Sequence, residues 1–142
     1  MDYLIRYALS FLGVPYIYGA NNRLVGLDCS GFVNEILRPA GIVKRFEDLS
    51  AQMLYNKLEA EGTMNTYKTG SIIFFGQSVT KITHVAFMLD RFLMLEAGGG
   101  GPECTTVEIA MAKGAMVRLS HINSRQDVVA VIYPRYNSIG LI

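Results

Sequence analysis

The chain has 142 residues, of which 51% are hydrophobic and 18% charged, and its formal net charge is +1 at pH 7. This composition is too apolar for a disordered chain, and the length suits one compact domain spanning residues 1–142. Because the charge is balanced and no basic run occurs, we expect no nucleic-acid partner.

The N-terminus offers no targeting signal. Residues 1–4 lack the basic and apolar regions of a signal peptide. No apolar stretch approaches the roughly 20 residues of a membrane-spanning helix. We therefore expect a protein that is made in the cytoplasm and does not span a membrane.

Apolar residues recur every three to four positions in three segments of the first half of the chain. This spacing predicts helices over residues 3–12, 29–37 and 50–60. In the third helix, Met53, Leu54 and Leu58 are expected on the buried side. Proline or glycine follows each segment and is expected to end it.

The second half of the chain has the composition of β-structure. We predict five strands, over residues 72–75, 83–89, 92–97, 115–119 and 128–133. Helices followed by strands indicate an α+β fold. Residues 98–101 are four consecutive glycines, which we expect to form a mobile loop.

The thiol of Cys29 lies where the second predicted helix begins. Unpaired N–H groups and the positive end of the helix dipole favour a thiolate at this position, and the thiolate is the nucleophilic form. The alternative is that Cys29 is a small buried hydrophobic residue, as most cysteines are.

A nucleophilic cysteine needs a base, and the chain has two histidines. His84 lies on a predicted strand, which holds an imidazole more rigidly than a loop does. His121 lies among polar residues and is expected to be structural or solvated. We therefore predict His84 as the base.

Glu96 is the candidate third group, which would orient the imidazole by accepting a hydrogen bond. A two-residue turn at Asp90 and Arg91 would place Glu96 on the sheet face opposite to His84. A three-residue loop over residues 89–91 makes the two residues direct cross-strand neighbours. We predict this three-residue loop. The alternative is a solvent-facing Glu96.

The second cysteine, Cys104, follows the glycine run. A Cys29–Cys104 disulfide is conceivable, but without an export signal we expect both thiols to stay reduced. The histidines and cysteines lack the spacing of metal ligands, so we expect no metal or other cofactor.

Four segments, in order and spacing, resemble the NlpC family of papain-like cell-wall cysteine peptidases, and the resemblance extends from about Arg6 to Arg135. The segments are Gly13-Val14-Pro15-Tyr16-Ile17-Tyr18-Gly19, Asp28-Cys29-Ser30-Gly31-Phe32, Gly70-Ser71-Ile72-Ile73-Phe74-Phe75 and Thr83-His84-Val85-Ala86. The resemblance implies a papain-like α+β domain in which N-terminal helices pack on a roughly five-stranded antiparallel sheet.

The resemblance also implies roles for individual residues. Cys29 would be the nucleophile and His84 the base, and Tyr16 would help to polarise the attacked carbonyl. Asp28 and Ser30 would line the pocket for the free amino end or polar groups of the peptide. The alternatives are an N-cap for Asp28, a first-turn polar residue for Ser30 and core packing for Tyr16.

The chain departs from the family pattern at the third catalytic residue. The family commonly has His there, sometimes Asn or Gln, whereas this chain has Glu96. A carboxylate stabilises an imidazolium more strongly and favours a Cys⁻/His⁺ pair. Ser71 also replaces a usual Asp and Ala20 a usual Gly, which leaves the details of the substrate open.

The activity implied by the resemblance is hydrolysis of an amide bond in bacterial cell-wall peptides, with the bond between D-glutamate and the diamino acid as the first choice. One alternative is an acyl transferase or amidase acting on another amide. Another is a structural or binding component of a phage or secretion system that keeps the fold. A cell-wall enzyme without a signal peptide would be virion-associated or exported by a phage or secretion system.

Overall fold

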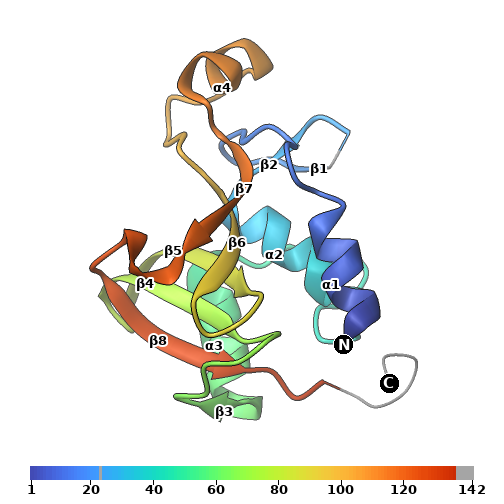
Figure 1. The fold of residues 1–142 in the computed structure, drawn as a ribbon, viewed down its shortest axis with the longest axis vertical. Helices are drawn as coiled ribbons and strands as arrows, with labels where there is room; N and C mark the ends of the chain where they lie inside the picture. The colour runs from blue at the N-terminus through green and yellow to red at the C-terminus, as the bar shows by residue number, and fades with distance from the viewer. Residues whose placement is uncertain (23, 137–142) are drawn as a thin grey trace.

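The computed structural model of the chain describes residues 1–22 and 24–136 (Figure 1). Its helices are α1 (Asp2–Leu9), α2 (Cys29–Leu37), α3 (Ala51–Glu61), α4 (Val107–Lys113) and the short 3-10 helix η1 (Ile122–Ser124). Its strands are β1 (Asn21–Asn22), β2 (Gly26–Leu27), β3 (Thr63–Met64), β4 (Ile72–Ser78), β5 (Lys81–Met88), β6 (Leu93–Gly98), β7 (Met116–His121) and β8 (Val128–Tyr133). Within these described residues, no helix is both long enough and apolar enough to cross a membrane.

The main sheet has the strand order β3-β8-β4-β5-β6-β7, and every neighbouring pair in it is antiparallel. The predicted α+β class is therefore confirmed, and all five predicted strands are present. The short strand β3 adds a sixth at one edge, and β1 pairs with β2 in a separate small sheet. These three strands have two residues each, too few to show a periodicity in the sequence.

Polar side chains fix where the helices begin. Asp28 accepts a hydrogen bond from the Gly31 N–H and caps α2, and Ser50 caps α3 in the same way. The prediction that the first helix reaches residue 12 is wrong, because α1 ends at Leu9. The chain turns after this point, and Gly13 adopts a φ of +88°. The N–H of Gly13 donates to the carbonyl of Val117 on β7.

The buried side of α3 differs at one residue from the prediction. Met53 is 50% exposed, so the expectation that it is buried is wrong. Tyr55 is buried instead, and its ring packs edge-on against Phe74 of β4 at a centroid distance of 5.4 Å. The buried positions of α3 follow a spacing of three and four residues that excludes position 53, namely Ala51, Leu54, Tyr55 and Leu58.

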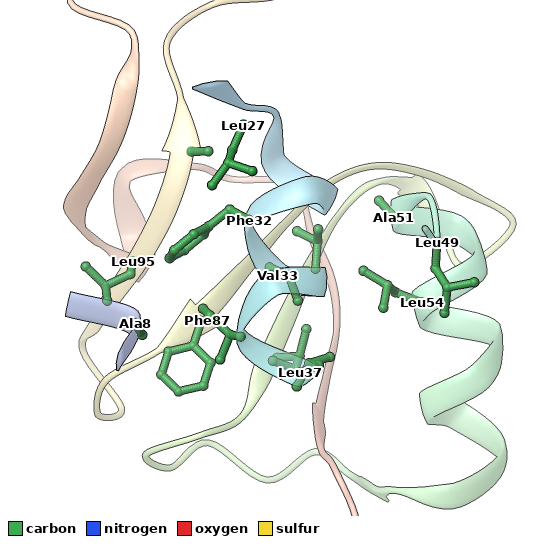
Figure 2. Close-up of a cluster of buried hydrophobic side chains, with 14 of the residues drawn as sticks. Ala8, Leu27, Phe32, Val33, Leu37, Leu49, Ala51, Leu54, Phe87 and Leu95 are labelled. Carbon is green, nitrogen blue, oxygen red and sulfur yellow. The ribbon is translucent and has the colours of Figure 1, made fainter. Parts of the chain in front are cut away.

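The core holds α2 against the sheet, alongside α3. In Figure 2, Phe32 of α2 points toward Leu95 of β6, whereas Val33 lies on the side of Leu54 of α3. All four side chains are fully buried, and each such side chain stabilises the fold by about 1.5–3 kcal/mol. The start of α2, and with it Cys29, is therefore held rigidly against the sheet.

The sheet buries side chains on both faces. One face packs against the helices, through residues such as Phe74 and Phe87. The other face carries a second apolar cluster, formed by Ile73, Phe75, Ala86, Met88, Met94 and Val131. His84 and Glu96 alternate in phase with this second cluster along β5 and β6.

The hairpin between β5 and β6 differs in register from the prediction. Phe87 pairs with Leu95 and Met88 with Met94, which shifts the strands by two residues. The prediction that His84 and Glu96 are direct cross-strand neighbours is therefore wrong. Because the shift is an even number of residues, both side chains still point to the same face, in a diagonal relation.

The cause of this shift lies in the turn. The Leu89 N–H bonds to the Leu93 carbonyl at 2.9 Å, which leaves a loop over residues 90–92, one residue later than predicted. The Asp90 carboxylate accepts hydrogen bonds from the N–H groups of Phe92 and Leu93 at 2.7 and 2.8 Å. An aspartate that binds the backbone two and three residues ahead favours a turn that starts at that residue.

Candidate active site

Cys29 is the first residue of α2 and is partly buried. Its own N–H has no acceptor among the described residues, as expected for the first turn of a helix. A thiol and a free N–H therefore occupy the same helix end, where the helix dipole favours negative charge.

The carboxylate of Asp28 is used by the chain itself. It accepts hydrogen bonds from the Gly31 N–H at 2.7 Å, the Ser30 hydroxyl at 3.3 Å and the Gly19 N–H at 3.2 Å. Burial raises the pKa of Asp28, and these three hydrogen bonds oppose the rise. Asp28 is thus the N-cap of α2, and Ser30 is bound to it. The predicted contact of both residues with a substrate stays a prediction.

The predicted partners His84 and Glu96 form a buried pair. Nε2 of His84 lies 2.6 Å from Oε1 of Glu96, and the two residues are only 7% and 3% exposed. The Phe75 ring packs beside the imidazole at a centroid distance of 5.4 Å. Regular pairing between β4 and β5 breaks just after Phe75, and such bulges redirect side chains near functional sites.

The second oxygen of Glu96 has partners on β7. Oε2 accepts hydrogen bonds from the Ser120 hydroxyl at 2.6 Å and from Nε of Arg118 at 3.3 Å. Burial alone would raise the pKa of Glu96, but its bonds to His84 and Ser120 lower the pKa to about 2. Glu96 is therefore a carboxylate at neutral pH.

Charge on the imidazole is stabilised in turn. Burial alone would lower the pKa of His84, but its interactions with Cys29 and Glu96 raise the pKa to about 9. Because Glu96 occupies Nε2, Nδ1 is the ring nitrogen left for Cys29. The arrangement favours an imidazolium that faces a thiol on one side and is held by a carboxylate on the other.

Tyr16 is held beside this group by an edge of the sheet. Its N–H bonds to the Ala115 carbonyl at 3.0 Å, and the preceding residue, Pro15, forms a bridge with Met116. Burial and the neighbouring Cys29 raise the pKa of Tyr16 to about 12. Its phenol therefore stays protonated at neutral pH and can donate a hydrogen bond. Its predicted contact with the attacked carbonyl stays a prediction.

The glycine run packs against Tyr16. A Cβ at Gly100 would lie only 2.2 Å from Cδ1 of Tyr16 and 2.9 Å from Cβ of Cys104. A side chain at Gly100 would therefore overlap the tyrosine ring. The prediction of a loop over residues 98–101 is wrong for Gly98, which is the last residue of β6. Nothing in the sequence indicated that these glycines form a wall of the site.

A cleft of about 680 Å³ opens beside Tyr16, His84 and Glu96, and this volume is typical of small-molecule and peptide sites. It is lined by Tyr16, Thr83, His84, Glu96, the glycines at 98–101, Arg118, Ser120, Ser124 and Arg125. Sequence reasoning missed Arg118, Ser120 and Arg125. The usable signal for Arg118 was its opposite charge to Glu96, with which it pairs directly across β6 and β7.

The other histidine and the second cysteine have structural surroundings. His121 is exposed, as expected, and its Nδ1 accepts a hydrogen bond from the Asn123 N–H. Cys104 is a free, fully buried thiol that donates to the Tyr16 carbonyl at 3.2 Å. Within residues 1–22 and 24–136, no group of three His, Cys, Asp or Glu side chains is placed to hold a metal ion.

Known proteins share the sequence pattern. The peptidoglycan endopeptidase RipB of Mycobacterium tuberculosis is 30% identical over 125 residues, which cover 79% of this chain and 49% of RipB. The bifunctional muramidase/DL-endopeptidase CwlT of Bacillus subtilis is 26% identical over 84% of this chain and 36% of its own length. The chain thus spans half or less of the length of these relatives.

The fold is shared as well. A solved structure of a lipoprotein-like protein of the NLP/P60 family from Staphylococcus aureus superposes with a TM-score of 0.67 at 22% identity. The superposition covers 94% of this chain and 41% of that one. The model of the NlpC/P60 family matches residues 13–121, which include Tyr16, Cys29, His84 and Glu96. This match covers most of the chain, which therefore belongs to the NlpC/P60 family, as its sequence motifs predicted.

Proposed function

We propose that the protein is a cysteine peptidase that hydrolyses an amide bond in peptidoglycan peptides. The observation that carries this proposal is the buried His84–Glu96 pair beside Cys29, at the start of α2. The similarity to RipB and CwlT, both named as endopeptidases, supports peptidoglycan as the substrate.

In the first half of the proposed reaction, the Cys29 thiolate adds to the carbonyl carbon of the amide. The negative charge that develops on the carbonyl oxygen is stabilised by the free Cys29 N–H and by the Tyr16 hydroxyl. As the C–N bond breaks, the His84 imidazolium gives its proton to the leaving amine. The products of this half are a free amine and a thioester on Cys29.

In the second half, His84 is neutral and accepts a proton from water. The resulting hydroxide adds to the thioester carbonyl, and the C–S bond breaks. The carboxylic acid leaves and Cys29 returns to the thiolate, while the imidazolium forms again. Glu96 keeps the ring oriented in both halves, because its carboxylate binds Nε2 throughout.

We further propose that the bond cleaved joins D-glutamate to the diamino acid. The similarity of the chain to CwlT, named as a DL-endopeptidase, supports this choice. A synthetic stem peptide containing this bond tests it directly, since mass spectrometry of the products identifies the bond that is cut. Cleavage at another amide would refute this choice and leave the peptidase proposal intact.

Purified peptidoglycan tests the activity itself. We expect the wild-type protein to release soluble peptide fragments with new free amino groups, and Cys29→Ala to release none. Cys104→Ser is the matched control, since it changes the other thiol and is expected to keep activity. Equal release by wild type and Cys29→Ala, or no release by wild type, would refute the proposal.

A further inference from the structure

We propose that Arg118 binds a carboxylate of the substrate next to the scissile amide, so that the enzyme selects peptides in which this carboxylate is free. This inference rests on the proposed peptide hydrolysis and deepens it. It assigns a substrate-binding role to a residue of β7 that lies outside the Cys29–His84–Glu96 group.

Only one of the three guanidinium nitrogens of Arg118 has a hydrogen-bond partner among the described residues. Its Nε donates to Oε2 of Glu96 at 3.3 Å, while Nη1 and Nη2 contact no acceptor among the described residues. The side chain lines the cleft and is 42% exposed. Two parallel N–H donors are thus available toward the cleft, which suits two-point binding of a carboxylate.

Gly98 and Gly99 leave room for Nη1 and Nη2 of Arg118, the two-nitrogen fork of the guanidinium. A Cβ at Gly98 would lie 3.2 Å from Nη2, and one at Gly99 would lie 2.9 Å from Nη1 of Arg118. The guanidinium therefore lies against backbone without side chains. Any larger residue at position 99 would press on the fork.

The charges of the site balance at each stage of the proposed reaction. Glu96 is bound both to His84 and to Arg118, so one carboxylate faces two cationic groups. While Cys29 is a thiolate, these four charges balance. When the thioester forms, Cys29 is neutral and His84 has given up its proton, so Glu96 then pairs with Arg118 alone and the charges still balance.

The second arginine of the cleft is a poorer candidate. Arg125 donates to both oxygens of Asp127, at 2.9 and 2.7 Å, and its guanidinium stacks over the Phe75 ring at 4.8 Å. Its charge is therefore already neutralised by a neighbouring carboxylate. This contrast makes Arg125 a matched control for Arg118.

The proposed substrate supplies a suitable anion. Glutamate has two carboxyl groups, and only one of them forms the scissile amide. The other is ionised at neutral pH and lies a few bonds from the carbonyl that Cys29 attacks. A carboxamide in its place is neutral and offers N–H donors of its own to the arginine fork, so it would bind poorly.

Two synthetic peptides test the inference. They contain the same D-glutamyl–diamino acid bond and differ only in whether the second glutamate carboxyl is a carboxylate or a carboxamide. We expect the wild-type kcat/KM to favour the carboxylate peptide about 10- to 100-fold, the range for a hydrogen-bonded ion pair. We expect this preference to come mainly from KM.

The Arg118→Met variant should lose this preference, Arg118→Lys should keep part of it, and Arg125→Met should keep it. A role of Arg118 only in holding Glu96 would lower kcat for both peptides equally and leave the ratio unchanged, which would overturn the inference. Wild-type cleavage of both peptides at the same rate would also overturn it while leaving the proposed hydrolysis standing. If the wild type cleaves neither peptide, the proposed bond and the inference both fall.

Discussion

The Glu96→Gln variant tests whether a carboxylate sets the protonation of His84. The substitution keeps the size of the side chain and an oxygen that can accept from Nε2, but it removes the negative charge 2.6 Å from the imidazole. The buried imidazolium then loses the carboxylate that faces its Nε2, while Cys29 stays beside it. We expect the pKa of His84 to fall from about 9 toward its ordinary value of 6.5.

The size of this fall follows from the bond that is lost. A hydrogen bond to a charged group contributes about 1.5–3 kcal/mol, and 1.36 kcal/mol corresponds to one pKa unit. The pKa of His84 should therefore decrease by about 1–2 units, to about 7–8. Because the leaving amine needs a proton from His84, the alkaline limb of the kcat/KM profile should move down by the same amount.

The assay is kcat/KM for a defined stem peptide between pH 5 and 10, with wild type, Glu96→Gln and Ser120→Ala compared. Ser120→Ala removes one hydrogen bond to Glu96 and keeps the carboxylate, so its alkaline limb should move less. An alkaline midpoint that stays in place in Glu96→Gln, or moves upward, would refute the role assigned to Glu96.

Three further predictions concern packing and stability. Gly100→Ala should reduce kcat/KM more than tenfold, since its Cβ would overlap the Tyr16 ring. Gly101→Ala is the control, because its Cβ has no neighbour closer than 3.5 Å and the substitution should act only through the backbone φ of +100° at this position. A smaller loss of kcat/KM for Gly100→Ala than for Gly101→Ala would contradict this prediction. Asp28→Ala should lower the free energy of unfolding, measured in urea, by about 1–2 kcal/mol. Asp28→Asn should lower it by less, because asparagine can still cap α2. Equal decreases in the two variants would count against the capping role. Since folding raises the pKa of His84 from 6.5 to about 9, its stabilising effect is complete below pH 6.5 and disappears as the pH rises through 9. The stability difference between wild type and His84→Asn should therefore shrink by on the order of 3 kcal/mol between pH 6 and 10, and a constant difference would show that His84 does not gain a proton on folding.

The sequence predicted the elements that have a clear period or a clear cap. Cys29 could be placed at a helix start because Asp28 precedes a helical apolar pattern, and the structure has this cap. The pairing of His84 with Glu96 was also predicted, but for the wrong register. A one-residue change in the strand register moves every side chain to the other face of the sheet, whereas a two-residue change keeps it on the same face. The error of two residues therefore left His84 and Glu96 on the same face, as predicted.

The rest of the site depends on contacts between distant segments, which have no local pattern. The wall at residues 98–101 is defined by how closely Gly100 approaches Tyr16, and that approach follows from the pairing of Tyr16 with the residue before β7. Helix α4 lies within the β6–β7 connection and was not predicted either. Its seven residues are too few for a reliable period.

The carboxylate of Glu96 links His84, the proposed acid, to Arg118, the proposed substrate-binding residue, because it binds both. A buried carboxylate is costly unless both oxygens are hydrogen-bonded and its charge is balanced. His84 satisfies Oε1, but Oε2 needs donors of its own and obtains them from Ser120 and Arg118 on β7. Only Arg118 has donors left over, and they face the cleft. A neutral third residue would need no such cation, so the choice of Glu96 places a carboxylate-binding group within reach of the scissile bond.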